Sequence, residues 1–295
     1  MLRRVTPRYS LVARWAPPPS DFVEVKGQVV HLRDEGPRDD PLPVVLLHGT
    51  AASLHTWQGW VQALKAQRRV ITFDLPGFGL TGPFGGRYTP DDYRGDTYAR
   101  FVIDLLDVLK LQRVVLGGNS LGGEIAWRVA TLAPGRVERL ILVDAGGPDF
   151  ASESQPIGFL IAGLPVLGWL SEQVLPRALV TQGIVNVYAD PKKVTAEVVD
   201  RYFELTLREG NRHALGLRRQ QAVRGQDFER ARTIKLPTLL IWGGQDRLIP
   251  PAVAQTFLKT IEGSQLVTFL DLGHVPQEED PVRTVVPVKT FLDLR

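Results

Sequence analysis

The sequence predicts an α/β protein whose mostly parallel sheet is covered by helices on both faces. Short, mostly apolar runs such as 44–47 and 70–73 alternate with segments whose apolar residues follow a helical period. Strands that are apolar at every position are typical of a parallel sheet between two helical layers, because both faces of such a strand are buried. A glycine-rich turn with one serine joins the apolar run at 114–116 to a helical segment, which places a reactive side chain at a strand end.

The first half of the chain follows this alternation closely. We place its strands at 21–25, 28–33, 44–47, 70–73, 114–116 and 140–143. We expect helices at 54–66 and 91–111, and a further one after Ser120, where Leu121, Ile125 and Val129 repeat at the spacing of a helix face.

The alternation stops after Val143 and resumes only at the strand 238–242, about 95 residues later, although one crossover helix needs roughly a dozen residues. We therefore predict a helical cap at 147–227, inserted over the carboxyl edge of the sheet. The remaining segments are an N-terminal arm at 1–20 and a core domain formed by 21–146 and 228–295.

The last part of the core should contain a helix at 251–262, a strand at 266–269 and a final helix. Asp280 and Pro281 fit the N-cap and the first position of that final helix. Pro287 lies inside it and is expected to kink it.

Composition excludes several classes of function. The 295 residues carry a net charge of +3 with dispersed basic residues, which argues against a nucleic-acid partner. Cysteine is absent, and the five histidines lack close metal-binding spacing, so we expect neither a metal nor another cofactor. The arginine-containing N-terminus lacks the apolar core of a signal peptide, and no run is long enough to span a bilayer. We expect a cytoplasmic protein with no stable membrane insertion, whose arm packs on the domain surface. Assembly into a homodimer is left open.

The segment Gly118-Asn119-Ser120-Leu121-Gly122 fits the pattern G-x-S-x-G of a nucleophile elbow. A serine on a sharp strand-to-helix turn needs small residues on either side, because larger side chains would collide with the neighbouring strand and helix. The backbone N–H of Leu121 then lies at the N-terminus of the helix and can stabilise an oxyanion.

A serine nucleophile needs a base, and the base needs an acid that fixes its tautomer. Downstream of Ser120 the candidates for the base are His274, which follows a strand, and His213, which lies among arginines and is expected at the surface. For the acid we prefer Asp246, which the loop after 238–242 would hold exposed at the strand end. The alternative, Asp144, is expected to cap backbone N–H groups at a turn.

The loop after the strand 44–47 should supply the second oxyanion donor. We choose the backbone N–H of Thr50, with that of Ala51 as the alternative. The side chain of His48 is expected to tether this loop through hydrogen bonds, and His31 and His55 are expected to be structural.

Five stretches, spread over roughly 42–290, together resemble the α/β-hydrolase superfamily in its cap-bearing branch. They read LLHGTAASLHTW, FDLPGFGLT, LGGNSLGGEIAWRVA, LLIWGGQDRLIP and LDLGHVPQEEDP. They are similar to the family's oxyanion loop, strand-four turn, elbow, acid loop and histidine loop, in the same order. The resemblance implies a mostly parallel eight-stranded sheet, a cap inserted after the sixth strand, and the triad Ser120–Asp246–His274.

Departures from the family's motifs reduce the number of activities to be expected. Haloalkane dehalogenases and epoxide hydrolases carry aspartate where this chain has Ser120, and the HGGG motif of lipases is absent. The GNSLGG elbow also resembles that of the C–C bond hydrolases of ring-fission products, which usually have tryptophan after the catalytic histidine; this chain has Val275. We expect a carboxylic-ester hydrolase for a small ester. C–C hydrolysis, cofactor-free perhydrolysis and a non-enzymatic ligand-binding role remain alternatives.

An uncharged stretch at 155–170 is the expected apolar lining of the substrate pocket. Its large apolar residues are Phe159, Leu160, Leu164, Leu167 and Trp169. An apolar roof above Ser120 would favour short- to medium-chain acyl groups, since each buried methylene stabilises binding by roughly 0.8 kcal/mol until the pocket is full.

Overall fold

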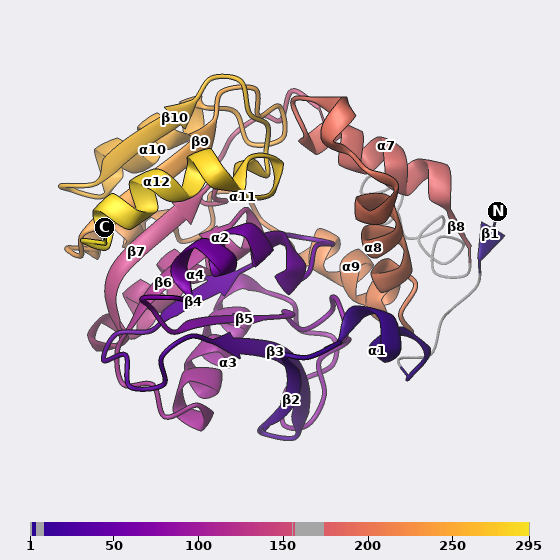
Figure 1. Ribbon diagram of the computed structural model, residues 1–295. Coiled ribbons are helices and arrows are strands. Elements are labelled where there is room, and N and C mark those ends of the chain that lie inside the picture. Colours follow the sequence, from indigo (N-terminus) through magenta and orange to yellow (C-terminus); the bar gives the residue numbers. More distant parts are fainter. Residues whose placement is uncertain (1, 4–8, 155, 157–173, 295) are drawn as a thin grey trace.

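The computed structural model describes residues 2–3, 9–154, 156 and 174–294, and its centre is an eight-stranded sheet (Figure 1). In chain order the strands are β2 (Ser20–Val25), β3 (Gln28–Glu35), β4 (Val44–Leu47), β5 (Val70–Phe73), β6 (Val114–Asn119), β7 (Val137–Val143), β9 (Thr238–Gly243) and β10 (Gln265–Phe269). Their spatial order is β10-β9-β7-β6-β4-β5-β3-β2. Only β3 runs antiparallel to its neighbours β2 and β5. The prediction of a mostly parallel eight-stranded sheet is confirmed.

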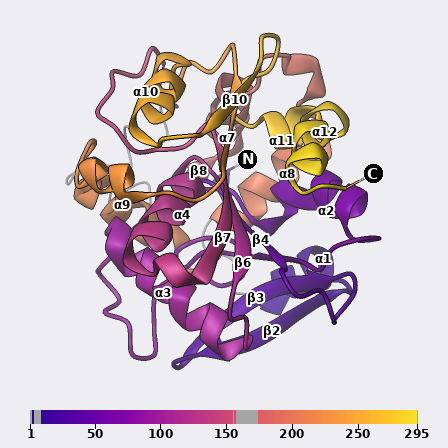
Figure 2. The ribbon, with the colours of Figure 1, turned by 90° about the vertical axis from the view of Figure 1, so that its left-hand side faces the viewer.

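Helices cover both faces of this sheet (Figure 2). They are α2 (Gln58–Leu64), α3 (Gly95–Val108), α4 (Leu121–Leu132), α10 (Ala252–Thr260), α11 (Pro276–Glu279) and α12 (Pro281–Phe291). Alternate side chains of β4 enter different cores. Val45 and Leu47 pack with residues of α3, α4 and α10, whereas Val44 and Leu46 pack with residues of α2 and α12. Complete burial on both faces explains why the strand is apolar at every position.

A helical cap is inserted after β7, the sixth strand of the sheet, and before β9. Its described elements are β8 (Leu175–Pro176), α7 (Arg177–Val187), α8 (Ala196–Thr206) and α9 (Asn211–Gln221). Figure 1 shows these helices grouped at one side of the molecule. The residues predicted to line the pocket from 155–170, namely Phe159, Leu160, Leu164, Leu167 and Trp169, lie outside the described residues.

The N-terminal arm contacts the cap as well as the core. It contains β1 (Leu2–Arg3), which pairs with β8, and α1 (Tyr9–Trp15). The indole Nε1–H of Trp15 donates to Glu204 on α8 at 2.8 Å, while the carbonyl of Trp15 lies 2.9 Å from Nε2 of His55 in the core. The arm was expected to pack on the domain surface. Its described residues do so and also contact the cap.

Several predicted helices are shorter in the structure. The segment expected at 54–66 begins as a 3-10 turn at Leu54–Trp57 before α2, and the helix expected at 91–111 is α3 alone. The final helix begins as predicted, since the Asp280 side chain accepts the N–H of Arg283 at 3.1 Å and Pro281 follows it. Among the described residues, no helix has the length and apolar character that crossing a membrane requires.

Candidate active site

Ser120 lies at the sharp turn between β6 and α4, with φ 56° and ψ −115°. This is a strained conformation for a residue other than glycine, and such strain is concentrated at functional sites. A Cβ atom at Gly118 would lie 2.2 Å from the backbone of Gly122, and a Cβ at Gly122 would lie 2.1 Å from the carbonyl oxygen of Leu47. The two glycines are therefore required by the space available, as the elbow pattern predicts.

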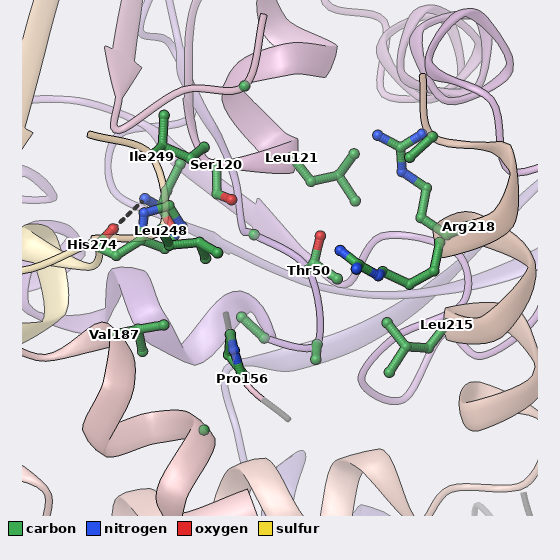
Figure 3. Close-up of a pocket in the computed structure, with 18 of the residues that line it drawn as sticks. Thr50, Ser120, Leu121, Pro156, Val187, Leu215, Arg218, Leu248, Ile249 and His274 are labelled. Atoms are coloured by element: carbon green, nitrogen blue, oxygen red, sulfur yellow. Dashed lines mark hydrogen bonds between the residues drawn. The ribbon is translucent and has the colours of Figure 1, made fainter. Parts of the chain in front are cut away.

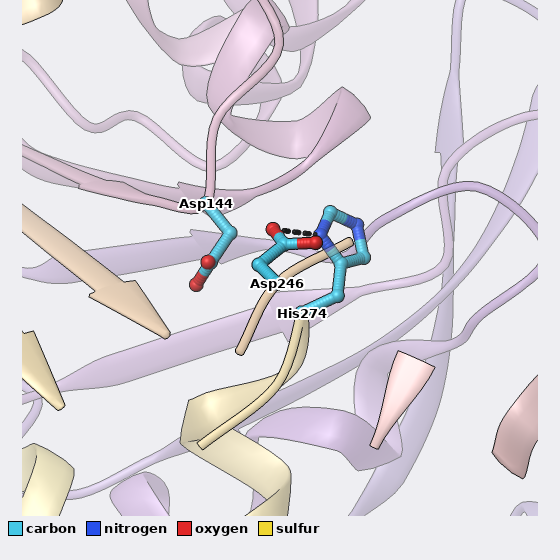
Figure 4. Close-up of side chains that lie close together, drawn as sticks. All are labelled: Asp144, Asp246 and His274. Atoms are coloured by element: carbon cyan, nitrogen blue, oxygen red, sulfur yellow. Dashed lines mark hydrogen bonds and ion pairs between the residues drawn. The ribbon is translucent and has the colours of Figure 1, made fainter. Parts of the chain in front are cut away.

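His274 and Asp246 form a buried hydrogen-bonded pair (Figure 4). The distance from His274 Nδ1 to Asp246 Oδ2 is 2.7 Å, and Asp246 Oδ1 accepts the backbone N–H groups of Leu248 and Ile249 at 2.8 and 2.9 Å. A carboxylate accepts only, so Nδ1 carries the proton and Nε2 is left as the basic atom. The prediction that Asp246 is exposed is wrong, because the residue is buried with 2% exposure.

Ser120 and His274 line the same cavity, which has a volume of about 250 Å³ (Figure 3). Asn119 holds their two loops together. Its side-chain Nδ2 donates to the carbonyl of His274 at 3.0 Å and to that of Val143 at 3.2 Å. The structure thus brings together the three residues predicted as a triad. Their catalytic roles stay a prediction that mutation tests.

The predicted oxyanion donors, Thr50 and Leu121, also line this cavity. Leu121 is the first residue of α4, and the first N–H groups of a helix have no partner within it. His48 tethers the other loop, as predicted. Its Nδ1 donates to the carbonyl of Gly49 at 2.7 Å and its Nε2 accepts the N–H of Leu75 at 2.9 Å. Burial lowers the pKa of His48 and keeps the ring neutral, which suits this donor–acceptor arrangement.

Asp144 lies on the opposite side of Asp246 from His274 (Figure 4). It is fully buried with φ 43°, and its Oδ1 accepts the N–H of Gly243 at 2.9 Å, as a capping residue would. Burial raises the pKa of Asp144 well above its ordinary value, and the Asp246 carboxylate adds to this shift. Among the described residues these three side chains are the one group with ligand-type atoms within 4.8 Å. Because Asp246 is fully engaged as the partner of His274, the arrangement fits acid–base chemistry rather than a metal centre.

The cavity has an apolar side and a charged side, which Figure 3 shows on either side of Thr50. Near His274 it is lined by Pro156, Val187, Leu248 and Ile249, and at the other side by Leu215 and Arg218. The charged residues among the described lining are Glu124, Arg128, Arg212, Arg218, Arg219 and Arg224. Arg218 is buried and binds Glu124 at 2.6 Å. Burial and the positive charges of Arg224 and Arg218 lower the pKa of Arg219.

Sequence reasoning missed these arginines and treated their segment as surface. His213 is indeed exposed, but its neighbour Arg212 is buried and lines the cavity. The available signal was the spacing of Arg212, Leu215 and Arg219 at i, i+3 and i+7, which places all three on one face of α9. A buried apolar residue on that face indicates that its arginines also point inward.

The fold agrees with comparisons to known proteins. Residues 43–281 match the family model described as alpha/beta hydrolase fold, and the chain belongs to this family.

Three proteins that are similar to this chain carry the names of different activities. A 2-hydroxy-6-oxo-2,4-heptadienoate hydrolase of Pseudomonas putida is 31% identical over 261 residues, covering 85% of this chain and 88% of the relative. The acetyltransferase component of the acetoin cleaving system of Pseudomonas putida is also 31% identical; the match covers 89% of this chain but 66% of that protein. A solved bacterial membrane phospholipase A superposes with a TM-score of 0.76 at 25% identity, covering 93% of this chain and 85% of the other.

Proposed function

We propose that this protein is a serine hydrolase that cleaves a C–C bond in an anionic ring-fission product. The observation that carries the proposal is the arginine-lined side of the cavity that also contains Ser120 and His274. Five arginines and one glutamate line this cavity among the described residues. Ring-fission dienoates carry a carboxylate, and guanidinium groups match carboxylates in geometry and charge. The heptadienoate hydrolase relative supports the same chemistry.

The reaction uses the triad in two stages. Ser120 Oγ attacks the ketone carbon while His274 Nε2 takes its proton, and the N–H groups of Thr50 and Leu121 hold the oxyanion. Before this attack the dienoate tautomerises, and the proton of its 2-hydroxyl group moves to C5, which becomes an sp3 carbon. The C5–C6 bond then breaks, its electron pair leaves as a conjugated dienolate, and the dienolate oxygen takes the proton that His274 holds. Water, deprotonated by His274, hydrolyses the acyl-serine. One water is consumed, and a carboxylic acid and a hydroxydienoate are released.

Ester hydrolysis by the same residues is the second candidate, because Val275 stands where C–C hydrolases usually have tryptophan. The similarity to a phospholipase A also favours it. Under this alternative, kcat/KM for p-nitrophenyl esters should rise from acetate through butyrate to hexanoate or octanoate and fall at palmitate. Such a maximum would reflect an apolar pocket of finite length.

The deciding experiment compares a 2-hydroxy-6-oxo-dienoate with the p-nitrophenyl esters on the purified protein. We expect higher kcat/KM for the dienoate, and loss of turnover by several orders of magnitude in Ser120→Ala. Ser264→Ala, a serine outside the cavity, is the matched control. Faster turnover of the esters would favour the second candidate. Without turnover, and without labelling of Ser120 by a fluorophosphonate, the protein would be a ligand-binding member of the family.

A variant on the charged side of the cavity separates the two substrates. Arg219→Gln should raise KM for the dienoate by roughly tenfold, because a charged hydrogen bond to its carboxylate is lost. KM for p-nitrophenyl butyrate should stay within about twofold. Equal effects on both substrates would contradict a carboxylate-binding role for this side.

A further inference from the structure

Two adjacent carboxylates follow the catalytic-histidine loop directly, and both bind the cap. They are Glu278 and Glu279 at the end of α11. Glu278 accepts the hydroxyl of Tyr202 on α8 at 2.8 Å and pairs with Arg201. Its other partner is the hydroxyl of Thr56, also at 2.8 Å.

Glu279 joins the cap to the loop that carries His274. It is buried, and Oε2 accepts the N–H of Gly273 at 2.8 Å. The same carboxylate accepts two N–H groups from the residues that follow α7 in the cap, that of Ala189 at 3.2 Å and that of Asp190 at 2.9 Å. One charged side chain therefore satisfies three backbone donors from two segments that are far apart in sequence. Hydrogen bonds to an ionised acceptor are about twice as strong as neutral ones.

The cap also accepts a hydrogen bond from the loop that carries His274. The backbone N–H of His274 donates to the carbonyl of Val187, the last residue of α7, at 2.7 Å. At Gly273 a Cβ would lie 2.5 Å from the Val187 oxygen and 2.7 Å from the Ala189 nitrogen. The contact is thus too close for any side chain at position 273. On the other side of His274, Val275 packs in one buried cluster with Ile184 and Tyr188 of the cap.

We infer that Glu279 is a positioning residue that makes the placement of His274 depend on docking of the cap. The residues before and after His274, and its own N–H, are all held by cap atoms or by the carboxylate that binds the cap. If the cap end of α7 moves away, Gly273 and His274 lose these bonds together, and Nε2 loses its fixed position beside Ser120. Catalysis then requires a docked cap. This inference rests on the triad of the proposed function, and is independent of whether a ketone or an ester is cleaved.

Glu279→Gln tests the inference, because it keeps the shape of the side chain while one carboxylate oxygen becomes an N–H₂ group that cannot accept. Two readouts are needed. Hydrogen–deuterium exchange should increase together in peptides covering 186–191 and 272–275. The rate at which a fluorophosphonate labels Ser120 should fall by roughly 10- to 100-fold, as expected for a misplaced base. In that reaction Ser120 Oγ bonds to phosphorus, fluoride leaves, and His274 takes the hydroxyl proton.

Glu262→Gln is the matched control, since Glu262 is exposed and pairs with Lys235 at the surface. It should label at the wild-type rate. Glu279→Asp keeps the charge and should recover part of the rate, which also covers the case in which the glutamine variant fails to fold. A purely structural role would lower the melting temperature and leave labelling per folded molecule unchanged, which would overturn the inference. Faster exchange in 186–191 alone would also overturn it. If wild type itself is not labelled, the triad fails and the proposed function with it.

Discussion

At the scale of single residues, the site contains two buried aspartates that differ in the hydrogen bonds they accept. Asp246 receives hydrogen bonds on both oxygens, including one from His274, whereas Asp144 receives one from Gly243. Burial and the negative charge of Asp246 raise the pKa of Asp144, so its uncharged form is favoured. An uncharged Asp144 places no second negative charge beside the acid–base pair.

This difference gives a prediction for a pair of matched substitutions. Asp246→Asn should reduce turnover by about four orders of magnitude, because the amide leaves His274 in the wrong tautomer. Asp144→Asn should keep the labelling rate of Ser120 within about tenfold, because asparagine resembles the uncharged acid. The measurement is fluorophosphonate labelling of both variants at neutral pH. If the Asp144 variant loses labelling and the Asp246 variant keeps it, the acid has been assigned to the wrong strand.

At the scale of elements, the strands and the glycine-flanked serine could be predicted from the sequence because their causes are local. Two-sided burial makes β4 apolar throughout, and Gly118 and Gly122 mark the elbow. The face of α9 that lines the cavity could not be predicted in this way, because it depends on distant residues. Arg218 looks like a surface residue until Glu124, on the distant helix α4, is known to pair with it.

The contacts between the N-terminal arm and the cap could not be predicted from the sequence for the same reason. Its contacts depend on partners far along the chain, since Glu204 on α8 binds both Arg14 and Trp15, about 190 residues away. No periodicity in the arm could show that partner. The burial of Asp246 likewise comes from the histidine loop and from Ile249 folding over it.

The arm gives an element-scale prediction. Trp15→Phe removes the indole N–H that donates to Glu204 and keeps most of the buried aromatic surface. The free energy of unfolding should fall by about 1 kcal/mol, because Arg14 still pairs with the carboxylate. A drop of about 2 °C in melting temperature is expected for a protein of this size. Tyr9→Phe, at an exposed position of the same helix, is the control. An unchanged melting temperature would mean that the indole bond contributes nothing.

At the scale of the whole molecule, two groups of buried residues give stability opposite dependences on pH. Burial lowers the pKa of His55 to about 3, with its Nδ1 accepting from Ser53. It also lowers the pKa of His48. A neutral histidine contributes stability that is present above its unfolded pKa and lost as the pH falls, because the unfolded chain then binds more protons. For Asp144 the sign is reversed. The folded state binds its proton more tightly, so stability is greatest below the unfolded pKa and declines as the pH rises.

The melting temperature should therefore rise from about pH 4 to about pH 6.5, where unfolded histidines titrate, and then decline as the pH rises further. The rising part of this curve is its acid limb and the falling part its alkaline limb, and one substitution tests each of them. His55→Gln should flatten the acid limb, because glutamine does not titrate, and Asp144→Asn should flatten the alkaline limb. The two residues belong to separate hydrogen-bond networks, so the double variant should show both effects additively. The measurement is the melting temperature, followed by circular dichroism across this pH range, of wild type, both single variants and the double variant. If Asp144→Asn changes the melting temperature equally at pH 5 and pH 8, Asp144 does not hold its proton in the folded protein.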